Sequence, residues 1–88
     1  MTTPAADAER RPAEVVHPGV HLREELEARN WTQRDLAAVM GRSPSVISAI
    51  IRGKMGISPR TAKELALALG TSAGYWRNLY ARYLRWHH

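Results

Sequence analysis

Apolar residues recur at spacings of three and four positions along most of the chain, and glycine, proline or small hydroxyl residues separate the runs. This spacing predicts amphipathic helices, because residues three and four apart share one face of a helix. No segment shows the strict alternation typical of a strand. The pattern therefore predicts an all-α fold of five short helices: residues 18–29, 33–40, 44–52 and 59–69, and a fifth that starts after Thr71 or Ser72 and runs to about Trp86.

The residues between the runs are of the kinds that start and stop helices. Thr32 suits the N-cap of the second helix, and Asp35 follows three residues later, near the positive end of the helix dipole. Gly41 is expected to end that helix, since glycine adopts a left-handed backbone at low steric cost. Similar start and stop residues stand at the other boundaries: Asn30, Ser43-Pro44, Ser58-Pro59 and Gly70.

The turn at Gly41 joins two predicted helices in a helix-turn-helix arrangement over about residues 33–52. Ala37 precedes Gly41 by four residues, and its small side chain allows the two helices to cross closely. Ile47 and Ile50 are expected to face the core beneath that crossing. Gln33 opens the first helix of the pair, where an amide and a helix N-terminus suit a phosphate. The spacing indicates DNA binding, and an αα-hairpin without a nucleic-acid role is the alternative.

Residues 1–16 differ from the rest of the chain, because they are rich in alanine, proline and charge and lack apolar periodicity. Such a composition buries too little apolar surface to offset the entropy of ordering. The sequence therefore predicts a flexible N-terminal arm over residues 1–16 and a helix-turn-helix domain over residues 17–88.

Charge is distributed unevenly over the 88 residues, whose net charge is +5. Residues 1–35 carry seven acidic and five basic side chains, whereas residues 36–88 carry one acidic and eight basic ones. A basic half favours a polyanionic partner, although ordinary solubilising charge would give the same count. The chain contains no cysteine, which suits a reducing cytoplasm, and no apolar run of membrane-spanning length or secretory leader.

In a helix-turn-helix the second helix of the pair enters the major groove with its N-terminal residues at the base edges. The residues expected to face bases here are Ser43, Pro44, Ser45, Ser48 and Ala49, with capping as the alternative role of Ser43. Arg42 is expected to bind either a guanine or a phosphate. The residues expected at phosphates are Gln33, Arg34, Arg52 and Lys54, while Arg60 and Lys63 are weaker candidates.

The last predicted helix carries more large apolar residues than one small core can bury. They are distributed around most of the helix: Tyr75, Trp76, Leu79, Tyr80, Tyr83, Leu84 and Trp86. A symmetric dimer or a bound partner would cover the surplus, and frayed last turns are the alternative. The sequence therefore predicts a dimerisation surface formed by Trp76, Leu79, Tyr80, Tyr83, Leu84 and Trp86.

No residue pattern indicates catalysis or a cofactor. His17 and His21 are four residues apart, but no third metal ligand accompanies them and His17 is expected to precede the helix. The sequence contains neither a Ser/His/Asp constellation nor a phosphate-binding glycine loop. We therefore expect no enzyme activity, no metal and no cofactor.

The segment TQRDLAAVMGRSPSVISAIIRGKMGISPRTAKELALALG resembles the Xre family of Cro/repressor-like helix-turn-helix proteins. Residues 17–79 are similar in particular to HigA-type antitoxins, through HPG before the first helix, WTQRDLA at the second, SPSVIS at the third, GKMGIS in the loop and GTSAGYW at the fifth. The resemblance implies a lambda-repressor-like fold.

The resemblance also implies a function and partners. An antitoxin of this kind neutralises an mRNA-cleaving HigB-type ribonuclease toxin and, as a homodimer, binds double-stranded operator DNA to repress its own operon. It would be cytoplasmic, and associated with the nucleoid when bound to DNA. Two alternatives stay open: a stand-alone or phage-type repressor without a toxin, and a toxin-binding module that has lost DNA affinity.

Overall fold

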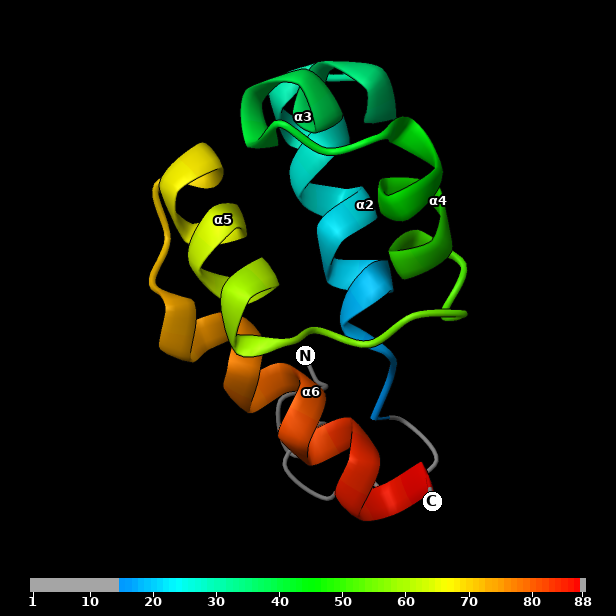
Figure 1. The fold of residues 1–88 in the computed structure, drawn as a ribbon. Helices are drawn as coiled ribbons and strands as arrows, with labels where there is room; N and C mark the ends of the chain where they lie inside the picture. Colours follow the sequence, from blue (N-terminus) through cyan, green and yellow to red (C-terminus); the bar gives the residue numbers. More distant parts are fainter. Residues whose placement is uncertain (1–14, 88) are drawn as a thin grey trace, which may run out of the picture.

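The computed structural model of the chain describes residues 15–87, which form five α-helices joined by short loops (Figure 1). The helices are α2 (Pro18–Arg29), α3 (Gln33–Met40), α4 (Pro44–Ile51), α5 (Pro59–Leu69) and α6 (Ala73–His87). No strand occurs in residues 15–87, so the prediction of an all-α, five-helix fold is confirmed. The predicted arm lies outside the described residues except for Val15 and Val16.

Most helix ends have the predicted chemistry. The Thr32 hydroxyl accepts a hydrogen bond from the Asp35 N–H at 3.0 Å, and the Asp35 carboxylate accepts one from the Thr32 N–H at 2.8 Å, which completes a capping box. Gly41 and Gly70 follow α3 and α5 with φ of 69° and 73°, in the left-handed region that glycine occupies without strain. These local sequence signals therefore fix where α3 begins and where α3 and α5 end.

The start of α4 differs from the prediction. Ser43 occupies the N-cap position, but its side chain makes no capping hydrogen bond to the helix backbone. Its hydroxyl lies instead 2.9 Å from the hydroxyl of Ser45. The predicted capping role of the Ser43 side chain is therefore wrong, and Pro44 at the first helical position supports the start of the helix through its fixed φ alone.

The core lies between the helices: α2 packs on α4 and α6, and α5 packs on α3 and α6. α3 lies across one end of the molecule and α6 at the opposite end (Figure 1). Each helix contributes at least one fully buried side chain, and the loop before α5 adds the buried Ile57. The buried apolar residues are Leu22, Leu26, Leu36, Ala37, Ile47, Ile50, Ile57, Ala62, Leu65, Leu69 and Trp76. The Trp76 indole N–H donates to the Thr71 hydroxyl at 2.8 Å, so its polar atom is satisfied inside the core.

The beginning of α2 and the end of α4 approach so closely that a side chain would not fit between them. A Cβ atom placed on Gly19 would overlap the carbonyl oxygen of Ile50 and contact the Ile51 Cα at 2.8 Å. Gly19, the second residue of α2, therefore has a packing role, because it lets the C-terminal turn of α4 contact the α2 backbone directly.

Ala37→Leu is expected to lower the free energy of unfolding by about 1–3 kcal/mol, because the added methyl groups overpack a site that is fully buried against α4. Urea unfolding of this variant and of Ala38→Leu, a matched change at an exposed position of the same helix, measures the effect. Equal stability of the two variants would contradict the close crossing of α3 and α4.

Candidate nucleic-acid interface

The N-terminal ends of α3 and α4 border one open groove of about 490 Å³. Its lining residues come from both helices of the helix-turn-helix: Thr32, Gln33, Arg34, Pro44, Ser45 and Ser48. Five of these residues were predicted from the sequence to face DNA. The structure therefore brings predicted base-facing and phosphate-facing residues together around one concave surface.

The wall contributed by α4 carries only short side chains. Pro44 and Ser45 are exposed, whereas Ser48 and Ala49 are partly buried on the same helix. Ser43 and Ala49 are not among the residues that line the groove. Short side chains let a base edge approach the helix closely, and a serine hydroxyl can donate to or accept from several bases.

The wall contributed by α3 presents the helix N-terminus together with Gln33 and Arg34, both exposed. Arg52 and Lys54 are exposed just beyond the last turn of α4. The Arg52 Nε donates to the Ser48 carbonyl oxygen at 3.4 Å. Gln33 and Arg34 therefore lie across the groove from α4, and Arg52 and Lys54 follow the C-terminal end of α4. Phosphate contacts from residues around a helix would fix its register on DNA, and the roles of these four residues stay predictions.

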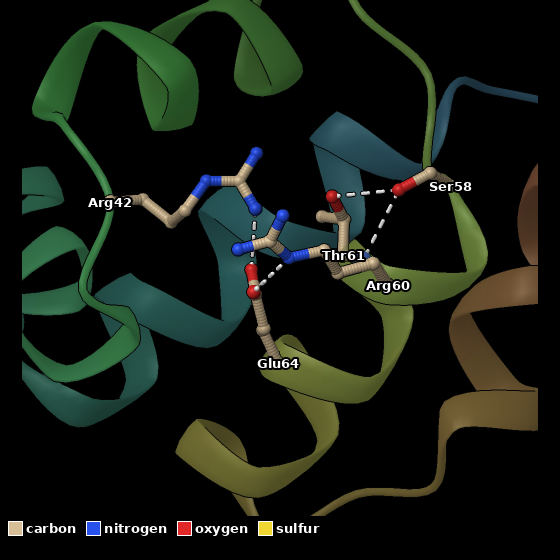
Figure 2. A network of polar contacts seen from close by, with 5 residues as sticks. All are labelled: Arg42, Ser58, Arg60, Thr61 and Glu64. Atoms are coloured by element: carbon tan, nitrogen blue, oxygen red, sulfur yellow. Dashed lines mark hydrogen bonds and ion pairs between the residues drawn. The ribbon is translucent and has the colours of Figure 1, made fainter.

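Arg42 does not lie as the sequence predicted. Its guanidinium donates to the Glu64 carboxylate at 2.6 Å, and the pair joins the turn before α4 to the middle of α5 (Figure 2). The two side chains are only 23% and 21% exposed. In this structure the guanidinium is thus bound to an internal carboxylate, not turned toward the groove where a base or phosphate would bind.

The sequence analysis did not identify Glu64 as the partner of Arg42, although the charge pattern marks Glu64 as unusual. It is the only acidic residue between positions 36 and 88, among eight basic ones. Desolvation raises the pKa of Glu64, but the hydrogen bonds from Arg60 and Arg42, with their charges, outweigh it and leave that pKa below its ordinary value of 4.5. Glu64 is therefore held as a carboxylate at neutral pH.

Only some residues of the predicted dimerisation surface on α6 are exposed to solvent. Trp76 is fully buried in the chain's own core, so its assignment to a dimer surface is wrong. Leu79, Tyr80 and Tyr83 are partly buried, and Tyr80 and Tyr83 pack edge-on against the His17 ring, with centroid distances of 6.0 and 4.9 Å. Leu84 and Trp86 stay exposed, Trp86 to 50%.

A second apolar surface was not predicted. Leu67 on α5 is 87% exposed, and it lines a shallow groove of about 170 Å³ with Val39 and Met40 of α3. Helical spacing did not reveal this surface, because Leu67 shares its face of α5 with the polar residues Lys63 and Glu64, and its proximity to α3 depends on tertiary packing.

His17 has a structural role. Its Nδ1 accepts a hydrogen bond from the Gly19 N–H at 2.9 Å, and it therefore caps α2 from outside the helix. Burial lowers its pKa, against a smaller opposing effect of a hydrogen bond with the Met55 backbone. Within residues 15–87, no three side chains of the metal-binding types gather at one place. None of the helices described is long and apolar enough to cross a membrane.

The fold has counterparts among known proteins. The helix-turn-helix family HTH_3 matches residues 22–76, well over half of the chain. An uncharacterized HTH-type transcriptional regulator of Escherichia coli K12, YddM, is 34% identical over 62 residues, which are 70% of this chain and 66% of that relative.

Two solved structures match over most of the domain. The addiction module antidote protein of the HigA family from Coxiella burnetii is 32% identical, with a TM-score of 0.77 over 86% of this chain and 80% of that one. The antitoxin HigA of Pseudomonas aeruginosa, solved with the higBA promoter, is 34% identical, with a TM-score of 0.77 over 85% and 79%. These matches define the class of the protein as helix-turn-helix DNA-binding regulators.

The chain belongs to the Xre-like helix-turn-helix family, as a HigA-type antitoxin. The matched residues 22–76 contain both helices that border the groove. The relatives are regulators and antitoxins, not enzymes.

Glu64→Gln is expected to destabilise the protein at pH 7 and to lose this effect in acid. The folded-state pKa of Glu64 lies below its ordinary value. The ionised carboxylate therefore stabilises the folded protein above pH 4.5, and this contribution is lost as the pH falls through the lowered pKa. Urea unfolding at neutral and acidic pH measures it, with Glu27→Gln on the exposed side of α2 as the matched control. A stability difference that is the same at both pH values would contradict the ion pair.

Substitutions at the two kinds of predicted contact should affect DNA binding differently. Ser45→Ala or Ser48→Ala should weaken binding to a selected duplex by at most about 1–3 kcal/mol, with little change on scrambled DNA, because a base contact carries sequence information. Arg52→Ala or Lys54→Ala should weaken both and reduce the slope of log affinity against log salt by about 0.9 for each phosphate that the variant no longer neutralises.

The measurement is a salt titration of all four variants on both duplexes. If the serine variants keep the parent's ratio of selected to scrambled affinity while Arg52→Ala changes it, α4 is not the helix that recognises sequence.

Proposed function

We propose that this chain is the antitoxin of a type II toxin–antitoxin system, which neutralises an mRNA-cleaving toxin of the HigB type and represses its own operon as a homodimer on operator DNA. The observation that carries the proposal is the groove between the N-terminal ends of α3 and α4, in a chain of the HigA type. The HigA relative from Pseudomonas aeruginosa was solved with the higBA promoter, and this supports the DNA-binding part of the proposal.

The short length of α4 supports the homodimer. α4 has eight residues, about 12 Å of helix, so one copy contacts only a few base pairs. A two-fold axis would place two copies of α4 about 34 Å apart, one turn of DNA, on an inverted repeat. Doubling the contacts would raise both affinity and sequence specificity.

Binding of the toxin is supported by apolar surface that DNA binding does not use. One exposed set comprises Leu84 and Trp86 at the end of α6, and the other comprises Val39 and Leu67 at the ends of α3 and α5. These helix ends lie at opposite ends of the molecule (Figure 1). A chain with two separate apolar surfaces has room for a second copy of itself and for a protein partner at the same time.

Two other functions predict different behaviour. A stand-alone repressor would bind its promoter and have no toxin beside it, and the regulator YddM is a relative whose name fits that reading. A toxin-binding module would neutralise a toxin and leave promoter DNA unbound. Both are distinguished from the proposal by testing neutralisation and DNA binding with the same preparation.

Co-expression should show that the chain restores growth to cells producing the ribonuclease encoded beside its gene, and a mobility shift should show binding to the promoter upstream. The Ser45→Ala/Ser48→Ala double variant should keep neutralisation and lose most promoter binding, because both serines line the DNA-facing groove. Arg23→Ala, an exposed change on α2, is the control for both assays. Growth arrest that persists with the parent chain would exclude the antitoxin function, and an unshifted promoter would exclude autorepression.

A further inference from the structure

We propose that Glu64 is a positioning residue for DNA recognition: through its ion pair with Arg42 it fixes the turn before α4 and thereby the orientation of that helix in the major groove. The inference rests on the proposed reading of operator DNA by α4. It assigns to Arg42 a role inside the protein, in place of the contact with a base or phosphate that the sequence suggested.

The first observation is that the start of α4 lacks its own side-chain cap. The Ser43 hydroxyl is paired with the Ser45 hydroxyl and not with the helix backbone. The backbone bonds of the turn are all local: the Arg42 N–H donates to Ala37 at 2.9 Å, and the Val46 N–H donates to Ser43 at 3.1 Å. These bonds join the turn to α3 and α4 but not to the remainder of the fold.

The second observation is the bond that makes this connection. Arg42 reaches Glu64 across 22 residues of sequence, and the contact joins the turn to α5 (Figure 2). Both side chains are largely sheltered from water, which strengthens the attraction and makes removal of either partner costly. The planar guanidinium also fixes the direction of its hydrogen bond, as a lysine would not.

The third observation is that Glu64 stands on a firmly held helix. The Ser58 hydroxyl caps α5 by accepting from the Thr61 N–H at 3.1 Å, and it also donates to the Thr61 hydroxyl at 3.0 Å (Figure 2). Leu65, the next residue after Glu64, is fully buried. The carboxylate is therefore carried by a helix that is anchored in the core, and it gives the turn a side-chain link to α5 in addition to the packing of Ile47 and Ile50.

Arg60 provides a control within the same cluster. It donates to the other carboxylate oxygen, Oε2, at 3.0 Å, whereas Arg42 binds Oε1. The Arg60 side chain is 80% exposed and lies on α5 itself, so this bond ties α5 to no other element. Removing Arg60 takes away a charge beside Glu64 and leaves the link to the turn in place.

The two possible roles of Arg42 predict opposite effects of removing the Glu64 carboxylate. If Glu64 positions α4, Glu64→Gln should spoil the directional contacts with bases while phosphate contacts and their salt dependence persist. If Glu64 merely withholds Arg42 from a phosphate, the same change should strengthen binding to all DNA and steepen the salt dependence.

The experiment uses the full chain and a duplex that the parent protein selects from a random library, so that it does not depend on where the natural operator lies. The affinities for this duplex and for a scrambled one are measured over a range of salt for Glu64→Gln, Arg42→Gln, Arg42→Lys and the exchanged pair Arg42→Glu/Glu64→Arg, with Arg60→Gln as the control. Thermal unfolding of each variant identifies the temperature at which all are folded.

We expect the ratio of selected to scrambled affinity to fall about tenfold in Glu64→Gln and Arg42→Gln, with an unchanged salt slope. Arg42→Lys should also lower the ratio, although it keeps the positive charge. The exchanged pair should recover most of the parent's ratio. Arg60→Gln should keep the ratio, because a phosphate contact is the most that Arg60 was expected to make, and losing one lowers the affinities for both duplexes alike.

A parent-like ratio in Glu64→Gln, or a steeper salt slope in that variant, would overturn the assignment. If the exchanged pair does not fold, Arg42→Lys decides: a parent-like ratio would show that only the charge of Arg42 matters and would likewise overturn it. The two proposals fail in different ways. A parent chain that selects no duplex from the library would contradict the proposed recognition of operator DNA. A parent chain that selects a duplex, together with a Glu64→Gln variant of equal selectivity, would contradict only the role of Glu64.

Discussion

The burial of one face of α4 is the interaction on which the rest of the structure depends. Eight residues are too few to form a stable helix in water, so α4 exists because Ile47 and Ile50 are fully buried beneath it. Gly19 lets the end of α4 rest on the backbone of α2, and Ala37 lets α3 cross it closely. With one face fixed in this way, the opposite face and the N-terminus are left at the surface, where DNA can reach them.

This arrangement imposes a conflict at the start of α4. A helix N-terminus gains stability from a side-chain cap, as Thr32 gives α3 and Ser58 gives α5. A cap on α4 would occupy backbone N–H groups and a hydroxyl at the point where base edges and phosphates approach. Ser43 makes no such cap, and the turn is instead connected to α5 through Arg42 and Glu64, whose contact lies away from the groove-lining residues.

Local chemistry made most of the fold predictable. The five helices, the capping box at Thr32 and the stop at Gly41 depend on residues within a few positions of one another, and the spacing of Ile47 and Ile50 marks the buried face. The groove was predictable for the same reason, since its residues occupy fixed places in a helix-turn-helix. The helix-turn-helix family match and the HigA-type structure independently support the fold.

The errors concern contacts between residues far apart in sequence. Nothing near Arg42 shows that a carboxylate 22 residues later would bind it, so its charge suggested DNA. The α6 aromatic residues looked like one surplus, but Trp76 belongs to the core and Tyr80 and Tyr83 pack on His17, which precedes α2. The exposed Leu67 was not considered at all, because the sequence predicts which face of its helix is buried and not whether the opposite face carries an apolar surface.

The short side chains on α4 give a reason why its positioning would matter more, under the proposed reading of DNA, than in a protein whose contacts come from long side chains. An arginine or glutamine can adjust several torsions to reach a base edge, whereas serine, proline and alanine have almost none to adjust. In the proposed reading of DNA, Ser45 and Ser48 would reach hydrogen-bonding distance of a base only with the helix itself placed correctly, and a shift of the turn would move both serines together. A rigid connection from the turn to the core gives short side chains the accuracy that they cannot supply themselves.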